Sequence, residues 1–145
     1  MRLSLQPPLD PSAYRYAHTL RTRFAETDAM GIIHHGAYPA YLEEARVAML
    51  RDAGHPYELV RSGPDGVDFA VLELFVRYRR PLRFDEAVDV HVLVGALTRT
   101  TFQVGYLLAV AGEARATAVT VHGAVGPSGR PSRMPAFLGA LVEAR

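Results

Sequence analysis

One long helical pattern, followed by four strand-like runs, constrains the fold of this chain more than any other feature. From about Ala37 to Ala53, apolar residues recur three and four positions apart, which is the spacing of one helix face. Pro39 stands where a first-turn proline is tolerated, and Gly54 and Pro56 mark the end of the pattern. A single long helix beside several strands predicts an α+β fold in which the helix packs on one sheet.

Strand patterns occur on both sides of this helix. Residues His18 to Phe24 alternate in polarity, which predicts a half-buried strand. After a loop with a short helical turn, four more strand patterns follow, at residues 69–78, 88–94, 102–110 and 114–125. The separators at 98–100 and 111–113 are short enough for hairpins, so we expect the last three runs to be antiparallel neighbours.

The ends of the chain carry weaker patterns. The proline-rich residues 1–16 are predicted to form an irregular arm, and residues 137–142 a short C-terminal helix. The 145 residues are enough to bury a core without disulfides or metals, so residues 1–145 are expected to form a single domain.

Four residue types, Cys, Trp, Lys and Asn, are absent from the chain. Without Cys there can be no disulfide, thiolate nucleophile, iron–sulfur cluster or zinc ribbon. Without Lys there can be no Schiff-base catalysis and no Gly-Lys-Ser/Thr phosphate loop. The net charge of +1 argues against a dedicated nucleic-acid-binding protein. No apolar run is long enough to span a bilayer and no secretory signal is visible, so we expect a cytoplasmic protein.

The densest group of reactive side chains precedes the predicted helix, and consists of Glu26, Asp28, His34, His35 and Tyr38. Unpaired backbone N–H groups at a helix start stabilise negative charge on a carbonyl oxygen, and a nearby carboxylate can attack or can activate water. Such a pair of features suits hydrolysis of an activated acyl group. Two alternatives stay open from position alone: Asp28 as a turn or capping residue, and a metal site built from the acids and histidines.

Residues 24–46 place these side chains in a longer motif. The matching positions are Asp28, Gly31, Ile32, Ile33, Tyr38 and Arg46. Two later features are Tyr78 followed by Pro81 at a strand end, and Arg133 shortly before Pro135. In this order and spacing, residues 17–140 resemble the hotdog-fold acyl-CoA thioesterases of the 4-hydroxybenzoyl-CoA thioesterase family, which includes the thioesterase associated with the Tol-Pal system.

The resemblance implies a hotdog fold, in which a curved antiparallel sheet of about five strands wraps around one long helix. It also implies that Asp28 is the catalytic carboxylate, and that His35 supplies the backbone N–H that polarises the thioester carbonyl. Gly36 and Tyr38 at the helix start are then expected to bind substrate. Met30 departs from the family pattern, in which small or polar residues are more usual at this position.

Arginine must supply any cationic side chain that binds the phosphates of coenzyme A, because the chain has no Lys. Candidates cluster at the end of the strand predicted at residues 69–78 and in the loop before the predicted C-terminal helix: Arg77, Arg79, Arg80, Arg83, Arg130 and Arg133. Of these we expect Arg80 and Arg133 to contact the substrate.

The expected activity is therefore hydrolysis of acyl-CoA to a free acid and coenzyme A, with no cofactor or metal. A hotdog hydratase or dehydratase pairing Asp28 with His34 is an alternative, as is a non-catalytic acyl-CoA-binding module. The acyl group stays open, as does the role of Asp28 as nucleophile or general base. Because one helix leaves sheet edges and one sheet face uncovered, we expect a homodimer or homotetramer, with no nucleic-acid partner.

Overall fold

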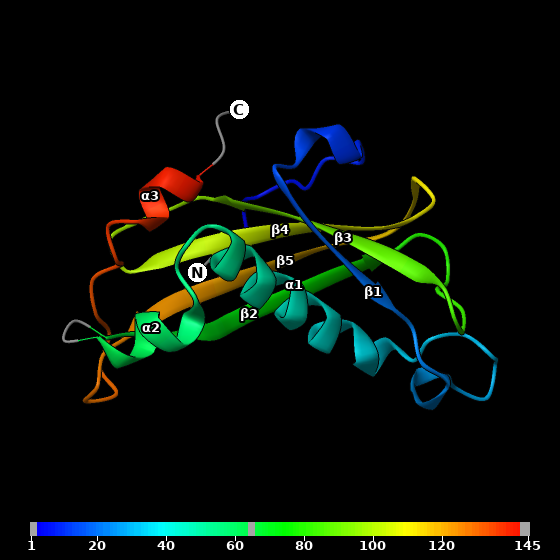
Figure 1. The fold of residues 1–145 in the computed structure, drawn as a ribbon, viewed down its shortest axis with the longest axis horizontal. Coiled ribbons are helices and arrows are strands. Elements are labelled where there is room, and N and C mark those ends of the chain that lie inside the picture. Colours follow the sequence, from blue (N-terminus) through cyan, green and yellow to red (C-terminus); the bar gives the residue numbers. More distant parts are fainter. Residues whose placement is uncertain (1–2, 64–65, 143–145) are drawn as a thin grey trace.

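A five-stranded antiparallel sheet wraps around one long helix (Figure 1). The computed structural model describes residues 3–63 and 66–142. The strands are β1 (Tyr16–Arg21), β2 (Asp68–Tyr78), β3 (Ala87–Gly95), β4 (Thr101–Val110) and β5 (Glu113–Val125). The α-helices are α1 (Tyr38–Asp52), α2 (Tyr57–Ser62) and α3 (Leu138–Leu141), and the short 3-10 helices are η1 (Pro11–Ala13), η2 (Phe24–Glu26) and η3 (His35–Ala37). The expected hotdog architecture is confirmed.

The strand order in the sheet is β1-β3-β4-β5-β2. Strands β3, β4 and β5 are successive antiparallel neighbours, which confirms the two hairpins predicted from short separators. The outer pairings, β1 with β3 and β2 with β5, join segments that are far apart in sequence. Strands β1 and β2 are therefore the two edges of the sheet.

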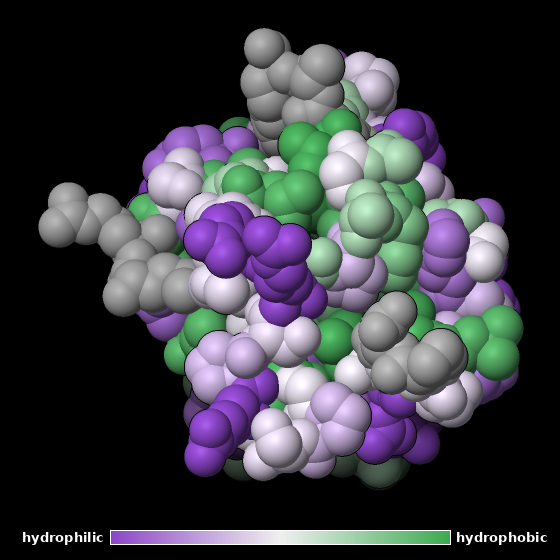
Figure 2. All heavy atoms as spheres, turned by 90° about the vertical axis from the view of Figure 1, so that its left-hand side faces the viewer, coloured by the Kyte–Doolittle hydropathy of each residue, from purple (hydrophilic) through white to green (hydrophobic). Residues whose placement is uncertain are grey.

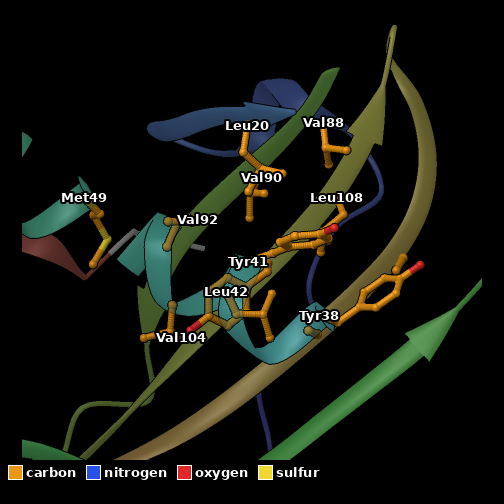
Figure 3. Packing of buried hydrophobic residues seen from close by; sticks show 14 of the residues in the cluster. Leu20, Tyr38, Tyr41, Leu42, Met49, Val88, Val90, Val92, Val104 and Leu108 are labelled. Carbon is orange, nitrogen blue, oxygen red and sulfur yellow. The ribbon is translucent and has the colours of Figure 1, made fainter. Parts of the chain in front are cut away.

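Helix α1 lies across one face of the sheet and buries its apolar side against it (Figure 1). Leu42 and Ala45 are completely buried, because their positions on α1 face the inward side chains of β3 and β4. Figure 3 shows Leu42 beside Val92 and Val104 in this core. Burying a Leu or Val side chain contributes roughly 1.5–3 kcal/mol, so this layer fixes the helix, and with it the segment that precedes the helix.

The first strand differs from its prediction at both ends. It begins at Tyr16 and ends at Arg21, whereas the alternating pattern extended to Phe24. Pairing with β3 ends where Arg21 meets Ala87, and the chain then turns into η2. Phe24 is consequently 74% exposed instead of buried on the strand face.

The N-terminal arm is docked on the sheet face opposite α1. The backbone N–H groups of Ser4 and Leu5 both donate to the side-chain oxygen of Gln103, at 3.1 Å each. Leu5 fills a hollow over Gly95 and Gly105, where an added Cβ would lie 2.9 and 3.0 Å from its methyl groups. The arm, expected to be irregular, therefore covers apolar surface that α1 does not reach.

Candidate active site

Asp28 lies in a tight turn whose backbone fixes the direction of its carboxylate. The N–H of Asp28 donates to the carbonyl of Ile32 at 2.8 Å, and the N–H of Gly31 donates to the carbonyl of Asp28 at 3.0 Å. Gly31 adopts φ +78°, a conformation that glycine reaches without strain. Oδ1 of Asp28 accepts from the N–H of Met30 at 2.9 Å. Within the described residues Oδ2 has no hydrogen bond, so it is the oxygen available to a substrate or water.

The short helix η3, which leads directly into α1, presents a free backbone donor near this turn. Nδ1 of His34 accepts from the N–H of Gly36 at 2.9 Å, which caps the short helix η3. In the part of the chain that the structure describes, the N–H of His35 has no hydrogen-bond acceptor. Because first-turn N–H groups and the helix dipole both favour negative charge, this donor suits a polarised carbonyl oxygen.

Gly36 has a local structural role in this arrangement. A Cβ at this position would lie 2.9 Å from Nδ1 of His34, so a larger residue would displace the capping ring. The rings of His34 and His35 stack with their centroids 4.2 Å apart. Gly36 is exposed and does not line the hollow described next, whereas it was expected to bind substrate.

A hollow of about 320 Å³ connects the turn, the helix start and the end of β2. It is lined by Asp28, Met30, Ile32, Ile33, His35, Tyr38, Tyr78, Arg79, Arg80 and Pro81. Four of the expected site residues, Asp28, His35, Tyr38 and Arg80, thus lie around one hollow although they come from separate parts of the chain. Met30 is 74% exposed and lies at its rim.

Tyr38 and Tyr78 form the aromatic side of this hollow. Their rings meet edge to face at a centroid distance of 5.0 Å, an orientation that aromatic pairs favour. Tyr38 is 2% exposed, and burial raises the pKa of its hydroxyl, so the hydroxyl stays protonated at neutral pH. The hollow therefore offers an apolar, aromatic surface next to the free oxygen of Asp28.

Glu26 and Tyr41 hold the Asp28 turn against α1. The Tyr41 hydroxyl donates to Oε1 of Glu26 at 2.6 Å, and the backbone N–H of Arg23 donates to the same oxygen at 2.8 Å. The carbonyl of Glu26 accepts from the N–H of His34 at 2.7 Å, which ties the two ends of the loop together. Burial alone would raise the pKa of Glu26, but these hydrogen bonds outweigh it and lower the pKa. Glu26 is thus a positioning residue.

Arg115 supports the opposite wall of the hollow, and the sequence analysis missed it. Its guanidinium donates to both carboxylate oxygens of Glu86, at 3.0 and 2.9 Å, and to the carbonyl of Pro81 at 2.7 Å. Hydrogen bonds to Glu86 and Glu113 raise the pKa of Arg115. Arg115 is the third residue of β5, and the sequence gave no signal of its role, because Pro81 and Glu86 come from the β2–β3 connection.

Comparison with known proteins agrees with this geometry. Residues 30–117 match the thioesterase superfamily. A provisionally named esterase from Aquifex aeolicus is 37% identical over 107 residues, which cover 74% of this chain and 82% of that protein. The solved structure of a hypothetical protein from Aquifex aeolicus superposes with a TM-score of 0.81 at 34% identity, covering 88% of this chain and 99% of the other. The chain belongs to the thioesterase superfamily.

An Escherichia coli O157:H7 protein named acyl-CoA thioester hydrolase is also similar to this thioesterase. It is 29% identical over 82 residues, which cover 57% of this chain and 60% of the Escherichia coli protein. A probable thioesterase from Bartonella henselae superposes with a TM-score of 0.78 at 24% identity, covering 83% of this chain and 98% of that one, and so supports the fold. Membership of the superfamily makes this chain a thioester hydrolase.

Arg80 and Arg133, the expected phosphate contacts, lie in different places on the thioesterase. Arg80 lines the Asp28 hollow, and among the described residues its guanidinium makes one long ion pair, with Glu113 at 3.8 Å. Arg133 lies in the loop of residues 126–135, drawn in orange on the left of Figure 1, whereas the Asp28 turn is on the right. Figure 2 looks onto this left-hand end, where strongly hydrophilic side chains lie beside hydrophobic ones. Within one chain, Arg133 is not brought to Asp28.

The acids and histidines before α1 are engaged separately. Glu26 binds Tyr41 and Arg23, Asp28 binds its own turn, and His34 binds Gly36. Among the residues described, no group of three or more His, Asp or Glu side chains is arranged to hold a metal ion. Likewise, the described residues include no helix long and apolar enough to cross a membrane.

Proposed function

We propose that this thioesterase hydrolyses acyl-CoA thioesters to a free acid and coenzyme A, with Asp28 as the catalytic carboxylate. The observation that carries the proposal is the pairing of two unused groups at one hollow, Oδ2 of Asp28 and the backbone N–H of His35. A thioester carbonyl hydrogen-bonded to that N–H places its carbon within reach of the carboxylate or of a water that the carboxylate binds. The name of the Escherichia coli relative, acyl-CoA thioester hydrolase, supports the choice of substrate class.

The chemistry balances with these groups alone. As general base, Asp28 takes a proton from water while the water oxygen bonds to the thioester carbon, and negative charge on the carbonyl oxygen is stabilised by the N–H of His35. The C–S bond then breaks, and the departing thiolate receives the proton from Asp28. Arg79 and Arg80 at the rim of the hollow are placed to pair with phosphates of the coenzyme A tail.

We further propose a homodimer formed through β2. This edge strand of 11 residues exposes five large hydrophobic side chains, each between 43% and 52% exposed: Val71, Leu72, Leu74, Phe75 and Tyr78. A long, apolar edge with an unpaired backbone invites pairing with another strand. Two copies of β2 paired antiparallel about a two-fold axis would satisfy the backbone and cover these side chains. The Asp28 hollow, which contains Tyr78, would then lie against the partner subunit.

No observation favours the hydratase alternative. Nδ1 of His34 is occupied by the N–H of Gly36, and His34 does not line the hollow that contains Asp28. A histidine used as an acid or base must reach the reacting atoms, and this one is directed to the cap of η3.

The test is a panel of acyl-CoA esters assayed by release of free thiol. Because the chain contains no Cys, the thiol reagent reports only coenzyme A. Asp28→Asn keeps the acceptor oxygen that binds the N–H of Met30 but removes the base, so kcat should fall by roughly 10²–10⁴-fold. Asp52→Asn, at the exposed end of α1, is the matched control and should keep the wild-type rate. A folded Asp28→Asn variant with wild-type kcat would overturn the role of Asp28, and a rate that EDTA abolishes would overturn metal-independent hydrolysis.

A further inference from the structure

A second pocket, of about 370 Å³, is lined by the later turns of α1 and the first part of β2, whereas the Asp28 hollow lies at the start of α1 and the end of β2. Its walls come from α1, α2, β2, β4 and β5, and most of its surface is apolar, with Leu50, Phe69 and Phe102 among the lining residues. Its polar lining includes the charged side chains of Glu43 and Arg46 and the ring of His122, none of which has a role in the site described above. Ligand sites typically combine an apolar wall with a few placed polar groups, which is the composition of this pocket.

Arg46 and His122 are connected by a buried chain of hydrogen bonds. The guanidinium of Arg46 donates to the Tyr106 hydroxyl at 3.2 Å, the Tyr106 and Thr120 hydroxyls lie 2.6 Å apart, and the Thr120 hydroxyl lies 2.7 Å from Nε2 of His122. Tyr106, Thr120 and His122 are each at most 2% exposed. A buried chain of this kind destabilises the fold unless each polar group has a hydrogen-bond partner. Which group donates and which accepts in each hydrogen bond therefore matters.

Arg46 sets that direction because a guanidinium can only donate. With Tyr106 accepting from Arg46, the arrangement that gives every hydroxyl proton an acceptor has Tyr106 donating to Thr120 and Thr120 donating to Nε2 of His122. The ring proton of neutral His122 is then on Nδ1. This buried atom has no hydrogen-bond partner within the described residues.

Arg46 also brings an unbalanced charge to the pocket. Among the described residues no carboxylate lies within ion-pair distance of its guanidinium, although Glu43 lines the same pocket one turn earlier on α1. Burial, and then the positive charge of Arg46, lower the pKa of His122 to about 3, so the ring is neutral at physiological pH. The pocket thus contains a guanidinium that has no ion-pair partner among the described residues, whereas Nδ1 of His122 is enclosed and not open to the pocket.

The proposed dimer joins this pocket to the active site. Antiparallel pairing of two β2 strands about a two-fold axis brings the Tyr78 end of one strand beside the opposite end of the other. Tyr78 lines the Asp28 hollow, whereas Phe69 and Val71 near the other end of β2 line the second pocket. Each Asp28 hollow would therefore adjoin the second pocket of the partner subunit.

We propose that the second pocket receives the far end of the acyl group, and that Arg46 selects acyl groups that end in a carboxylate. The inference rests on the proposed acyl-CoA hydrolysis and names its substrate class. A terminal carboxylate balances the charge of Arg46 and accepts from its guanidinium, whereas a terminal methyl leaves that charge unbalanced.

The experiment compares hexanoyl-CoA with adipoyl-CoA, which differ only in a terminal methyl against a terminal carboxylate. The wild type should prefer adipoyl-CoA in kcat/KM by roughly tenfold or more, the usual effect of hydrogen bonds to a charged group. Arg46→Met keeps the aliphatic stem but removes the donors, and should abolish this preference while hydrolysing hexanoyl-CoA normally. Arg51→Met, on the last turn of the same helix, is the matched control and should keep the preference.

A second readout does not need turnover. Free adipate should raise the melting temperature of the wild type more than hexanoate does, and Arg46→Met should remove the difference. Stabilisation by adipate without any hydrolysis would refute the proposed function while supporting the pocket. Equal hydrolysis of both esters, with no selective stabilisation, would refute the pocket while leaving the function intact. Weaker dimerisation of Arg46→Met with unchanged selectivity would also refute it, because Arg46 would then pair across the subunit interface.

Discussion

The hydrogen bond between Tyr41 and Glu26 predicts a measurable link between α1 and the catalytic turn. Tyr41→Phe removes only the hydroxyl, which donates to Oε1 of Glu26 at 2.6 Å. Tyr41 is 4% exposed and the Glu26 side chain is 15% exposed, so solvent replaces the lost bond poorly. Hydrogen bonds to charged groups contribute about 1.5–3 kcal/mol, and we expect the free energy of unfolding to fall by about 2 kcal/mol. For a chain of this length that corresponds to a melting temperature lower by roughly 6 °C.

The same substitution should change how stability depends on pH. The pKa of Glu26 is lowered below its ordinary value of 4.5 in the folded protein, since burial would raise the pKa but the hydrogen bonds from Tyr41 and Arg23 outweigh it. A carboxyl whose pKa is lower in the folded state adds stability above its unfolded pKa and loses that contribution as pH falls through its folded pKa. The advantage of the wild type over Tyr41→Phe is therefore greatest at neutral pH and shrinks in acid.

Urea unfolding followed by circular dichroism, at one fixed protein concentration, measures both effects. Tyr16→Phe is the control, because among the described residues the Tyr16 hydroxyl accepts one exposed hydrogen bond, from Arg15. The reasoning is refuted if Tyr41→Phe has the wild-type midpoint at pH 7, or if its deficit is the same at pH 7 and in acid. A lower kcat with little change in KM would accompany the loss, because the Asp28 turn would be less firmly held.

Three further substitutions probe other parts of the structure. Gly31→Ala places a side chain at φ +78°, and should lower the free energy of unfolding by about 1 kcal/mol, measured by thermal unfolding. It should also lower kcat in the thiol-release assay. Gly105→Ala sets a Cβ 3.0 Å from Leu5, and should loosen the N-terminal arm, giving faster cleavage near Leu5 in limited proteolysis. Arg115→Met leaves Glu86 without its bidentate partner, and we expect the free energy of unfolding, measured with urea at pH 7, to fall by about 2 kcal/mol. Because the pKa of Glu86 is lowered in the folded protein, this deficit should become smaller in acid, where Glu86 is protonated. An unchanged unfolding midpoint for Arg115→Met would contradict its supporting role.

Sequence patterns within single segments predicted those helices and hairpins that depend mainly on interactions within the segment. The helix of residues 37–53 was predicted because apolar spacing and Pro39, Gly54 and Pro56 act within the segment, and α1 spans Tyr38–Asp52. The two hairpins of β3, β4 and β5 followed from short separators. The first strand was misplaced because Phe24 continues the alternation in sequence, while pairing with β3 stops at Arg21.

The candidate site was partly predictable for the same reason. Asp28, His35 and Tyr38 come from one continuous motif, and the structure places all three around one hollow. Arg133 lies outside this continuous motif, and within a single chain it is in another part of the molecule. Arg115 and Tyr41 gave no sequence signal, because their roles depend on carboxylates that only the folded chain brings to them.

By itself, the sequence determined the class of fold, the helix that carries the site, the carboxylate turn before it and the absence of thiol or lysine chemistry. These properties depend on residue types and on spacings within short segments, which exist before the chain folds. Tertiary structure alone decided that β2 is an edge strand, that Glu26 and Arg115 are positioning groups, and that Arg46 shares a pocket with His122. Those relations join residues that are separated in sequence, and strand pairing together with the packing of α1 on the sheet brings them together.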